Sequence, residues 1–385
     1  MKKKISLIII VLLIISTVSV IFFTDFETLT NISLDIDKII NTIFSSKDNT
    51  QKVSDINLIS EKNTKKYCET LFSLTKSGKT EFPLYIYDES MFSIMNSAYQ
   101  KFLDENPEIF WTDNFQIYKI ESHGAPIQYK LVIETNTDSE LIEKERERLD
   151  LEIEKILSQI DKNMSDYEKA IFVHDYIIKN CEYDTELADK IVNGKELSEK
   201  DNLQRSAYGC LVEKSTICSG YAKAYQIIMR KLGIECIYIY GTTKTEAHAW
   251  NCINIDGEYY NVDLTWDESE DPEEVKYDYF CFTDANRSDS EHMFVTITQH
   301  PACTATRYNY FIYNGYYLKE YSFNEASKII SKQLNNDKVY IKFPSKEETE
   351  KALYDLIEQN RIFNIIQVSK IRYSYTDTLI SIEIE

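Results

Sequence analysis

One short turn constrains the fold of this chain more than any other feature of its sequence. Asp256-Gly257 separates two strand-like segments, residues 247–255 and 258–266. An Asp-Gly pair in this position is a strong signal for a tight two-residue β-hairpin. The two segments are therefore predicted to pair as antiparallel strands.

The register of this hairpin brings an imidazole and a carboxylate together. If residues 255 and 258 face each other, His248 lies opposite Thr265, and Asp263 lies opposite Trp250. Alternate residues share one face of a sheet, so His248 and Asp263 are expected as diagonal neighbours, with Cα atoms about 7–8 Å apart. The carboxylate is then expected to hold the ring in one tautomer and to stabilise its charged form.

A cysteine lies at the start of a predicted helix upstream of the hairpin. The helix covers residues 219–232 and is expected to end at Gly233, and Cys218 directly precedes it. Backbone N–H groups and the positive end of the helix dipole favour the thiolate, which is the nucleophilic form of cysteine. Ser219 and Gly220 are expected to leave the approach to the sulfur open.

Three motifs, in the chain order Cys, His, Asp, resemble the core motifs of the transglutaminase-like superfamily. They are Thr216-Ile217-Cys218-Ser219-Gly220-Tyr221-Ala222, His248-Ala249-Trp250-Asn251 and Tyr260-Asn261-Val262-Asp263-Leu264-Thr265-Trp266-Asp267. Other segments between residues 100 and 300 resemble the exported bacterial branch of this superfamily. These are Pro107-Glu108-Ile109-Phe110-Trp111, His174-Asp175-Tyr176, Tyr183-Asp184, Ala207-Tyr208-Gly209, Tyr279-Phe280 and His292.

The resemblance implies a papain-like α+β core that performs acyl transfer through a thioester on Cys218. It also implies that His248 and Asp263 complete a catalytic triad, and that the backbone N–H of Cys218 helps to stabilise the oxyanion. Tyr208 is a candidate for the second oxyanion donor. Trp250 and Trp266 are candidates for substrate contacts, although core packing is the expectation for both. No cofactor or metal is expected.

The N-terminus is predicted to be a membrane anchor. Residues 1–4 contain three lysines and form a short cytoplasmic tail, and the nineteen residues from Ile5 to Phe23 carry no charge. Such a run spans most of a ~30 Å hydrocarbon layer, and the lysines favour a cytoplasmic N-terminus. A cleaved signal peptide is the alternative, but this run is long and ends in bulky residues.

The remaining chain divides into a spacer and three predicted domains. Residues 24–60 form the spacer, 61–161 an N-terminal α+β domain, 162–300 the catalytic domain, and 301–385 a small C-terminal α/β domain. Long helices are predicted over 138–161 and from Ser165 to Asn180. His174 lies on the apolar face of the second helix, where packing or a structural hydrogen bond is expected.

The chain is acidic, with a formal net charge of −20. This charge excludes nucleic-acid binding by bulk electrostatics. Residues 256–291 contain 13 acidic side chains and two basic ones. A solvated loop explains this composition, and the alternative is a loop in which Asp267, Glu268, Glu270 and Asp271 select cationic substrates.

The eight cysteines are not spaced as a disulfide or zinc motif. No Cys-x-x-Cys pair is present, and a chain of 385 residues has enough core to bury thiols as small hydrophobes. Most cysteines are therefore expected to be free and buried, and a structural zinc site is not expected.

Together these features predict a membrane-anchored cysteine enzyme with its catalytic domain outside the cytoplasm. Its expected substrates are peptides or proteins at the cell surface or wall. Peptidase or amidase activity is favoured over cross-linking, since both reactions use the same acyl-enzyme. The alternative is a non-catalytic surface module for binding or assembly that uses the same fold as a scaffold.

Overall fold

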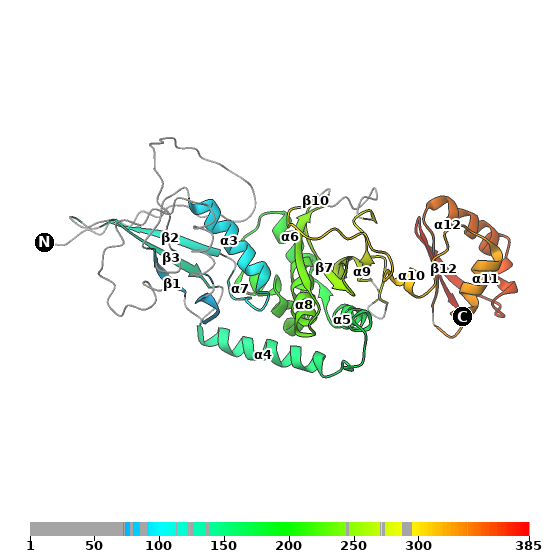
Figure 1. Cartoon of the computed structure of the whole chain (residues 1–385), viewed down its shortest axis with the longest axis horizontal. Helices are drawn as coiled ribbons and strands as arrows, with labels where there is room; N and C mark the ends of the chain where they lie inside the picture. Colours follow the sequence, from blue (N-terminus) through cyan, green and yellow to red (C-terminus); the bar gives the residue numbers. More distant parts are fainter. Residues whose placement is uncertain are drawn as a thin grey trace, which may run out of the picture. The chain divides into compact units, whose positions relative to one another are not determined.

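The structure is a computed structural model of the whole chain (Figure 1). It describes residues 72, 74–77, 80–84, 91–112, 114–121, 123, 127–135, 139–243, 246–269, 271, 274–286, 295–336 and 338–384. The predicted anchor over 5–23, the spacer over 24–60 and His292 lie outside these residues. Within them, no helix is both long enough and apolar enough to cross a bilayer.

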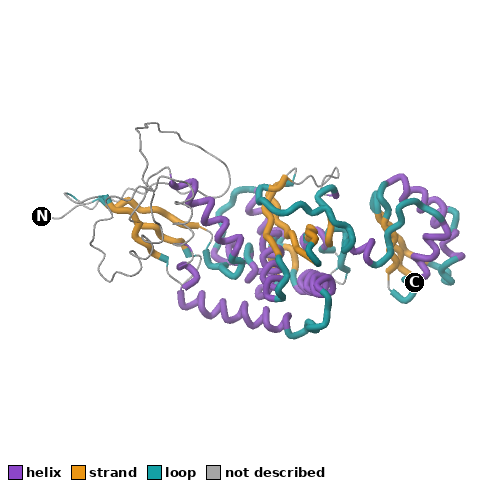
Figure 2. The backbone as a smooth tube through the Cα atoms, viewed as in Figure 1, coloured by secondary structure: helices purple, strands orange, loops and turns teal. Residues whose placement is uncertain are grey.

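The chain divides into two compact units. Unit 1 contains Met1–Asn163 and Lys179–Gly233, and unit 2 contains Met164–Ile178 and Ile234–Glu385. Both units combine helices with antiparallel sheets, so the predicted α+β class is confirmed (Figure 2). The predicted domain boundaries stay predictions.

Unit 1 contains a three-stranded antiparallel sheet in the order β1-β3-β2. Its strands are β1 (Glu81–Leu84), β2 (Asn114–Ile120) and β3 (Gln128–Glu134). The last two strands pair in a register in which Phe115 faces Ile133. The ring of Phe115 belongs to a buried aromatic cluster with Phe72 and Tyr99, which forms the core of this part of the unit.

Most of the helical structure of unit 1 follows this sheet or lies between its strands. The helices are η1 (Leu74–Ser77), α3 (Phe92–Glu105), α4 (Ser139–Leu157), α6 (Thr185–Val192), α7 (Glu199–Gln204), η3 (Gly209–Glu213) and α8 (Cys218–Lys231). The long charged helix predicted over 138–161 is confirmed as α4, which buries Leu149, Ile153 and Ile156 on one side. Helix α8 is fixed to the end of α3, because Gln226 and Arg230 donate to backbone carbonyl oxygens of Asp104 and Glu105.

Unit 2 contains a five-stranded antiparallel sheet in the order β10-β6-β7-β8-β9. Its strands are β6 (Cys236–Thr242), β7 (Ala247–Ile255), β8 (Glu258–Val262), β9 (Phe280–Phe282) and β10 (Val295–Thr296). The predicted hairpin is confirmed, with Ile255 facing Glu258. Both turn residues have positive φ, 52° at Asp256 and 84° at Gly257, as a type I′ turn requires.

Helix α5 (Asp166–Asn180) begins at the predicted position. The Ser165 hydroxyl accepts from the Glu168 N–H, and the Glu168 carboxylate accepts from the Ser165 N–H, which forms a capping box. His174 and Ile177 lie on its buried face. The helix therefore presents a histidine to the interior of unit 2.

Residues 301–385 form a second sheet in unit 2 with the order β11-β13-β12. The elements are α10 (Tyr310–Tyr313), α11 (Phe323–Lys332), β11 (Lys338–Lys342), α12 (Lys346–Leu353), η5 (Tyr354–Glu358), η6 (Arg361–Asn364), β12 (Ile371–Tyr375) and β13 (Leu379–Ile384). Figure 2 shows α11 and α12 on one side of this sheet. Before α11, Tyr317 makes an isolated bridge to Lys342 at the end of β11.

Candidate active site

Cys218 is the first residue of helix α8, one residue earlier in the helix than predicted. The chain reaches it through β5 (Ser215–Thr216), which pairs in parallel with β4 (Glu182–Tyr183). Ile217 is extended at φ −109° and ψ −177° and provides no side-chain cap for the helix. The half-buried, free thiol of Cys218 is thus placed at a helix N-terminus, where backbone N–H groups point outward.

Ser219 and Gly220 have a different role from the open approach that the sequence suggested. The Ser219 hydroxyl donates to the Arg205 carbonyl oxygen at 2.8 Å. Gly220 is buried, and a Cβ atom there would lie 1.8 Å from Thr216 Oγ1 and 2.7 Å from the Ser206 carbonyl oxygen. The pair therefore allows the first turn of α8 to pack against the 205–206 turn, and so fixes the backbone of Cys218.

Tyr208, the candidate oxyanion donor, is buried in unit 1 with 1% of its surface exposed. Its ring stacks on Phe110 at a centroid distance of 4.8 Å, and its hydroxyl accepts a hydrogen bond from Arg148. This environment is that of a packing residue. A role as an oxyanion donor stays a prediction.

His248 and Asp263 form a buried pair in unit 2. The His248 Nε2 atom lies 2.6 Å from Asp263 Oδ2, and the two residues are 3% and 1% exposed. A hydrogen bond this close between an imidazole and a carboxylate fixes the orientation of the ring. The contact that the hairpin register predicted is present.

The route by which Asp263 reaches His248 differs from the prediction. Strand β8 ends at Val262, and its pairing with β7 ends where Val262 faces Asn251. The predicted pairing of His248 with Thr265 is therefore wrong, as is that of Trp250 with Asp263. Asp263 is instead the N-cap of the short helix α9 (Leu264–Asp267), and its Oδ1 accepts from the N–H groups of Thr265 and Trp266. Oδ1 therefore caps helix α9, while Oδ2 contacts His248.

Both tryptophans stack near the imidazole of His248 but differ in exposure. Trp250 is 1% exposed and donates through Nε1 to Asn261 Oδ1 at 3.1 Å. Trp266 is half-buried and stacks on His248, with ring centroids 4.9 Å apart. Trp250 is therefore a core residue, whereas a substrate contact at Trp266 stays a prediction.

A second buried histidine–carboxylate group includes Asp267, at the other end of α9 from Asp263. His174 Nε2 is 3.1 Å from Asp267 Oδ2, and His174 Nδ1 is 3.0 Å from Asp175 Oδ1. Asp267 also accepts from the Tyr279 N–H at 2.9 Å. The structural hydrogen bond expected for His174 is confirmed. Because Asp267 is the last residue of α9, this contact fixes the helix whose N-cap is Asp263.

The same contact corrects the hypothesis of an acidic substrate loop. Asp267 is fully buried, so it does not belong to a solvent-facing acidic surface. Glu268 is half-buried and Asp271 is exposed, while Glu270 lies outside the described residues. The hypothesis that all four of these carboxylates face a cationic substrate is therefore wrong, because Asp267 is buried.

The pKa values of His174 and Asp267 are both raised above their usual values. Burial favours the neutral imidazole and by itself lowers the pKa of His174, but the hydrogen bonds to Asp175 and Asp267 outweigh it and raise the pKa to about 9. Burial raises the pKa of Asp267 to about 7, although the bonds from His174 and Tyr279 favour the carboxylate. His174 is thus a buried imidazolium at neutral pH.

This charge predicts a pH-dependent stability. A folded-state pKa above the unfolded value of about 6.5 contributes stability below pH 6.5, and the contribution is lost as the pH rises through about 9. We expect the wild-type free energy of unfolding to lose about 2 kcal/mol from this group between pH 7.5 and 10. Denaturant unfolding at several pH values measures this loss.

The His174→Gln variant should lack this part of the pH dependence over the same range. His123→Gln replaces an exposed histidine and should follow the wild-type curve. Identical slopes for wild type and His174→Gln would contradict the assignment of a buried imidazolium.

Comparison with known families identifies a domain that includes these residues. The model described as the transglutaminase-like superfamily matches residues 154–264, a range that includes Cys218, His248 and Asp263. The Kyphoscoliosis peptidase of Mus musculus is 28% identical over 114 residues, which cover 26% of this chain and 16% of that protein. The Homo sapiens protein of the same name is 26% identical with the same coverage. The chain thus spans about one sixth of the length of these curated relatives.

Solved structures with partial similarity include a TGase, at 15% identity and a TM-score of 0.30 over 50% of this chain and 52% of that one. A candidate cysteine protease from Cytophaga hutchinsonii is 17% identical, with a TM-score of 0.23 over 40% of this chain and 62% of that one. The sequence resemblance is confirmed by the family match, and the chain contains a transglutaminase-like domain over residues 154–264.

Proposed function

We propose that the chain is a cysteine acyl-transfer enzyme in which Cys218, His248 and Asp263 act as nucleophile, base and orienting carboxylate. The observation that carries this proposal is the buried contact of 2.6 Å between His248 Nε2 and Asp263 Oδ2. A catalytic base needs a fixed ring orientation, and a carboxylate on one ring nitrogen supplies it. The transglutaminase-like match over 154–264 supports the inclusion of Cys218.

The proposed reaction has two steps. The Cys218 sulfur attacks the carbonyl carbon of a carboxamide or peptide bond and forms a C–S bond, while the C–N bond breaks. Through Nδ1, His248 passes the proton of the thiol to the leaving amine. Water or a second amine then attacks the thioester carbon, the C–S bond breaks, and the proton of the attacking group returns through His248 to the sulfur.

The outcome depends on which nucleophile resolves the thioester. Water gives peptidase or amidase activity, and an amine gives transamidation. We propose hydrolysis as the main reaction. A non-catalytic binding or assembly module is the second candidate, but an inert scaffold has no physical need for Cys218, His248 and Asp263 together.

The site of action is proposed from the sequence. The uncharged run from Ile5 to Phe23 would hold the enzyme in the membrane, with the catalytic residues outside the cytoplasm. Its substrates would then be peptides or proteins at the cell surface or wall. Fractionation of cells expressing the full chain, with protease treatment of intact cells, tests this location.

The decisive test of the chemistry is intact-mass analysis of the full chain in detergent. Iodoacetamide at low concentration is expected to alkylate Cys218 first, because the proposed triad would pair its sulfur with the imidazolium of His248. His248→Ala should slow this alkylation at least about tenfold at neutral pH. His123→Ala, which removes an exposed histidine outside the proposed triad, should not.

Incubation with peptides and a primary amine then separates the two outcomes. Cleaved peptides indicate a hydrolase, and peptides that carry the amine indicate a transferase. Alkylation of Cys218 that is equally fast in wild type and His248→Ala would contradict the proposed triad.

A further inference from the structure

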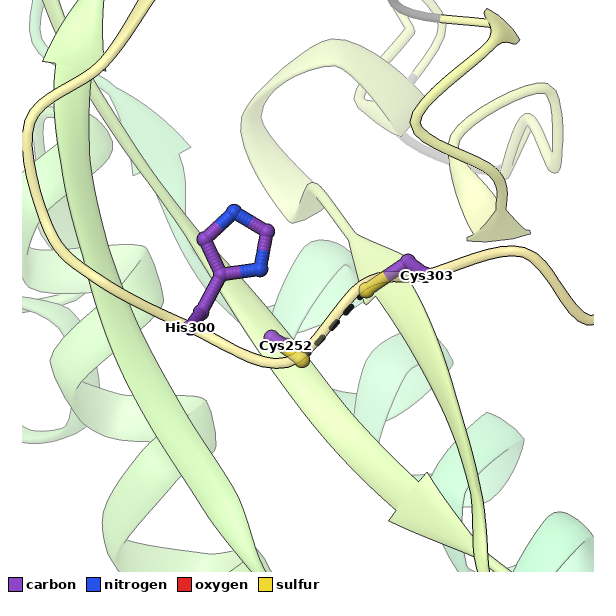
Figure 3. A group of neighbouring side chains, drawn as sticks. All are labelled: Cys252, His300 and Cys303. Atoms are coloured by element: carbon purple, nitrogen blue, oxygen red, sulfur yellow. Dashed lines mark hydrogen bonds between the residues drawn. The ribbon is translucent and has the colours of Figure 1, made fainter.

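Three metal-binding side chains that are not part of the proposed triad meet on the sheet of unit 2. The sulfur atoms of Cys252 and Cys303 are 3.4 Å apart, and a ring nitrogen of His300 lies within 4.8 Å of both. Figure 3 shows the imidazole beside the two sulfur atoms, with Cys252 on a strand and the other two residues on the segment that crosses it. Both cysteines are free and fully buried, and His300 is half-buried.

The position of Cys252 is fixed by the middle of the sheet. It lies on β7, where it faces Ile237 on β6 and Asn261 on β8. Backbone pairing on both sides leaves this Cα atom little freedom. A metal ion at this sulfur would therefore bind to a rigid element.

The position of Cys303 is fixed by Asp284. The Cys303 N–H donates to Asp284 Oδ2 at 2.9 Å, and the Asp284 N–H donates to the Cys303 carbonyl oxygen at 2.8 Å. Asp284 Oδ1 in turn accepts from Asn261 Nδ2 at 3.0 Å. Two segments far apart in the sequence thus hold the two sulfur atoms together without a covalent bond.

His300 is held by its neighbour in the chain. Its Nδ1 atom lies 2.7 Å from the Pro301 carbonyl oxygen, so Nδ1 carries the proton of this hydrogen bond. Metal binding through Nε2 would keep this bond, as is usual for metal-bound histidines. Binding through Nδ1 would release the proton and break the bond.

We propose that Cys252, Cys303 and His300 bind one zinc ion. Thiolate and imidazole together are the donor set that zinc prefers, and three protein ligands leave a fourth tetrahedral position for water or a further donor. Two thiolates on one tetrahedral zinc, each at about 2.3 Å, lie about 3.8 Å apart. The observed 3.4 Å is within a few tenths of an ångström of this separation. Binding releases the two thiol protons to solvent.

The third ligand distinguishes this proposal from a disulfide. Oxidation of Cys252 and Cys303 would use only the two sulfur atoms and would give His300 no role. A zinc ion uses all three side chains. It would also bind segment 300–303 to strand β7, four residues along that strand from His248.

The test uses the full chain in detergent, stripped with a chelator under reducing conditions and then equilibrated with Zn²⁺. We expect one equivalent of zinc by elemental analysis. Replacement of zinc by Co²⁺ should give thiolate-to-metal charge-transfer absorption. Cys303→Ser and His300→Ala should each weaken binding by at least about 100-fold, since even outer-shell changes cost 10–100-fold.

Two control variants isolate the site. Cys181→Ser removes a buried thiol of unit 1, and Cys218→Ala removes the proposed nucleophile, and both should keep one equivalent of zinc. If Cys303→Ser fails to fold, the zinc stoichiometry of the wild type and the zinc affinity of His300→Ala still test the proposal. No zinc retained by wild type would overturn the proposal, as would a Cys252–Cys303 disulfide that, once reduced, takes up no metal. Loss of zinc in Cys218→Ala would also overturn it.

Discussion

Replacing Cys218 by alanine is expected to lower kcat/KM by at least about 10⁴-fold on any peptide that the wild-type chain cleaves or modifies. The proposed thioester needs the sulfur atom, and no other step of the reaction can start without it. Fold and stability should change little, because Cys218 is half-buried and alanine is a good residue for the first turn of a helix. Release of the leaving amine from a peptide, followed by mass spectrometry, measures the loss.

The matched control for this variant is Cys181→Ala. Cys181 is a buried, free thiol of the same unit, with its sulfur 3.9 Å from the Glu182 carbonyl oxygen. Its loss should cost about 1 kcal/mol of stability and leave kcat/KM within a factor of about three. A Cys218→Ala chain that keeps its activity within tenfold of wild type would exclude the proposed nucleophile and favour the non-catalytic module.

The sequence predicted those elements whose signals are local. The Asp256-Gly257 turn fixes the register of its hairpin because both positions need positive φ, and few residue pairs accept it. The capping box of Ser165 and Glu168 likewise marks the start of α5. Such features depend on neighbouring residues only, so a single sequence is sufficient to find them.

The predicted end of strand β8 was wrong because alternation does not show where a strand stops. In the sequence, the alternation of residues between the two strand faces can be continued through Asp263 to Trp266. In the structure, strand β8 ends at Val262 and helix α9 follows. A local signal was present: Asp is a preferred N-cap residue, and Asp263 caps the N–H groups two and three residues later. The His248–Asp263 contact survives because the cap position directly follows the strand.

Other parts of the site depend on contacts between distant residues. His174 and Asp267 are 93 residues apart, and neither the apolar face of α5 nor the acidic composition of 256–291 indicates that they meet. Position 220 needs glycine because Thr216 and Ser206 leave no room for a Cβ atom, and only the folded chain brings these residues close. The proposed zinc ligands are likewise separated, so the absence of a Cys-x-x-Cys motif says nothing about them.

Replacing Asp263 by asparagine is expected to lower kcat by about 10³–10⁴-fold with little change in KM. An amide cannot stabilise the imidazolium as a carboxylate does, and it can donate to His248 Nε2 and so select the wrong tautomer. Asparagine is as good an N-cap as aspartate, and its oxygen can still accept from the Thr265 and Trp266 N–H groups. The free energy of unfolding should therefore change by less than about 1 kcal/mol. Parallel measurement of kcat, KM and urea unfolding separates the two effects.

Asp263→Ala and Ser322→Ala complete this comparison. The first removes both the cap and the carboxylate, and should lose activity together with about 1 kcal/mol of stability. The second removes the cap of α11, where Ser322 accepts from the Glu325 N–H at 3.3 Å, and should lose similar stability with unchanged kcat. If Asp263→Asn keeps wild-type kcat while Asp263→Ala loses activity and stability together, the carboxylate serves only as the cap of α9. The buried contact with His248 would then stabilise the fold and carry no part of the reaction.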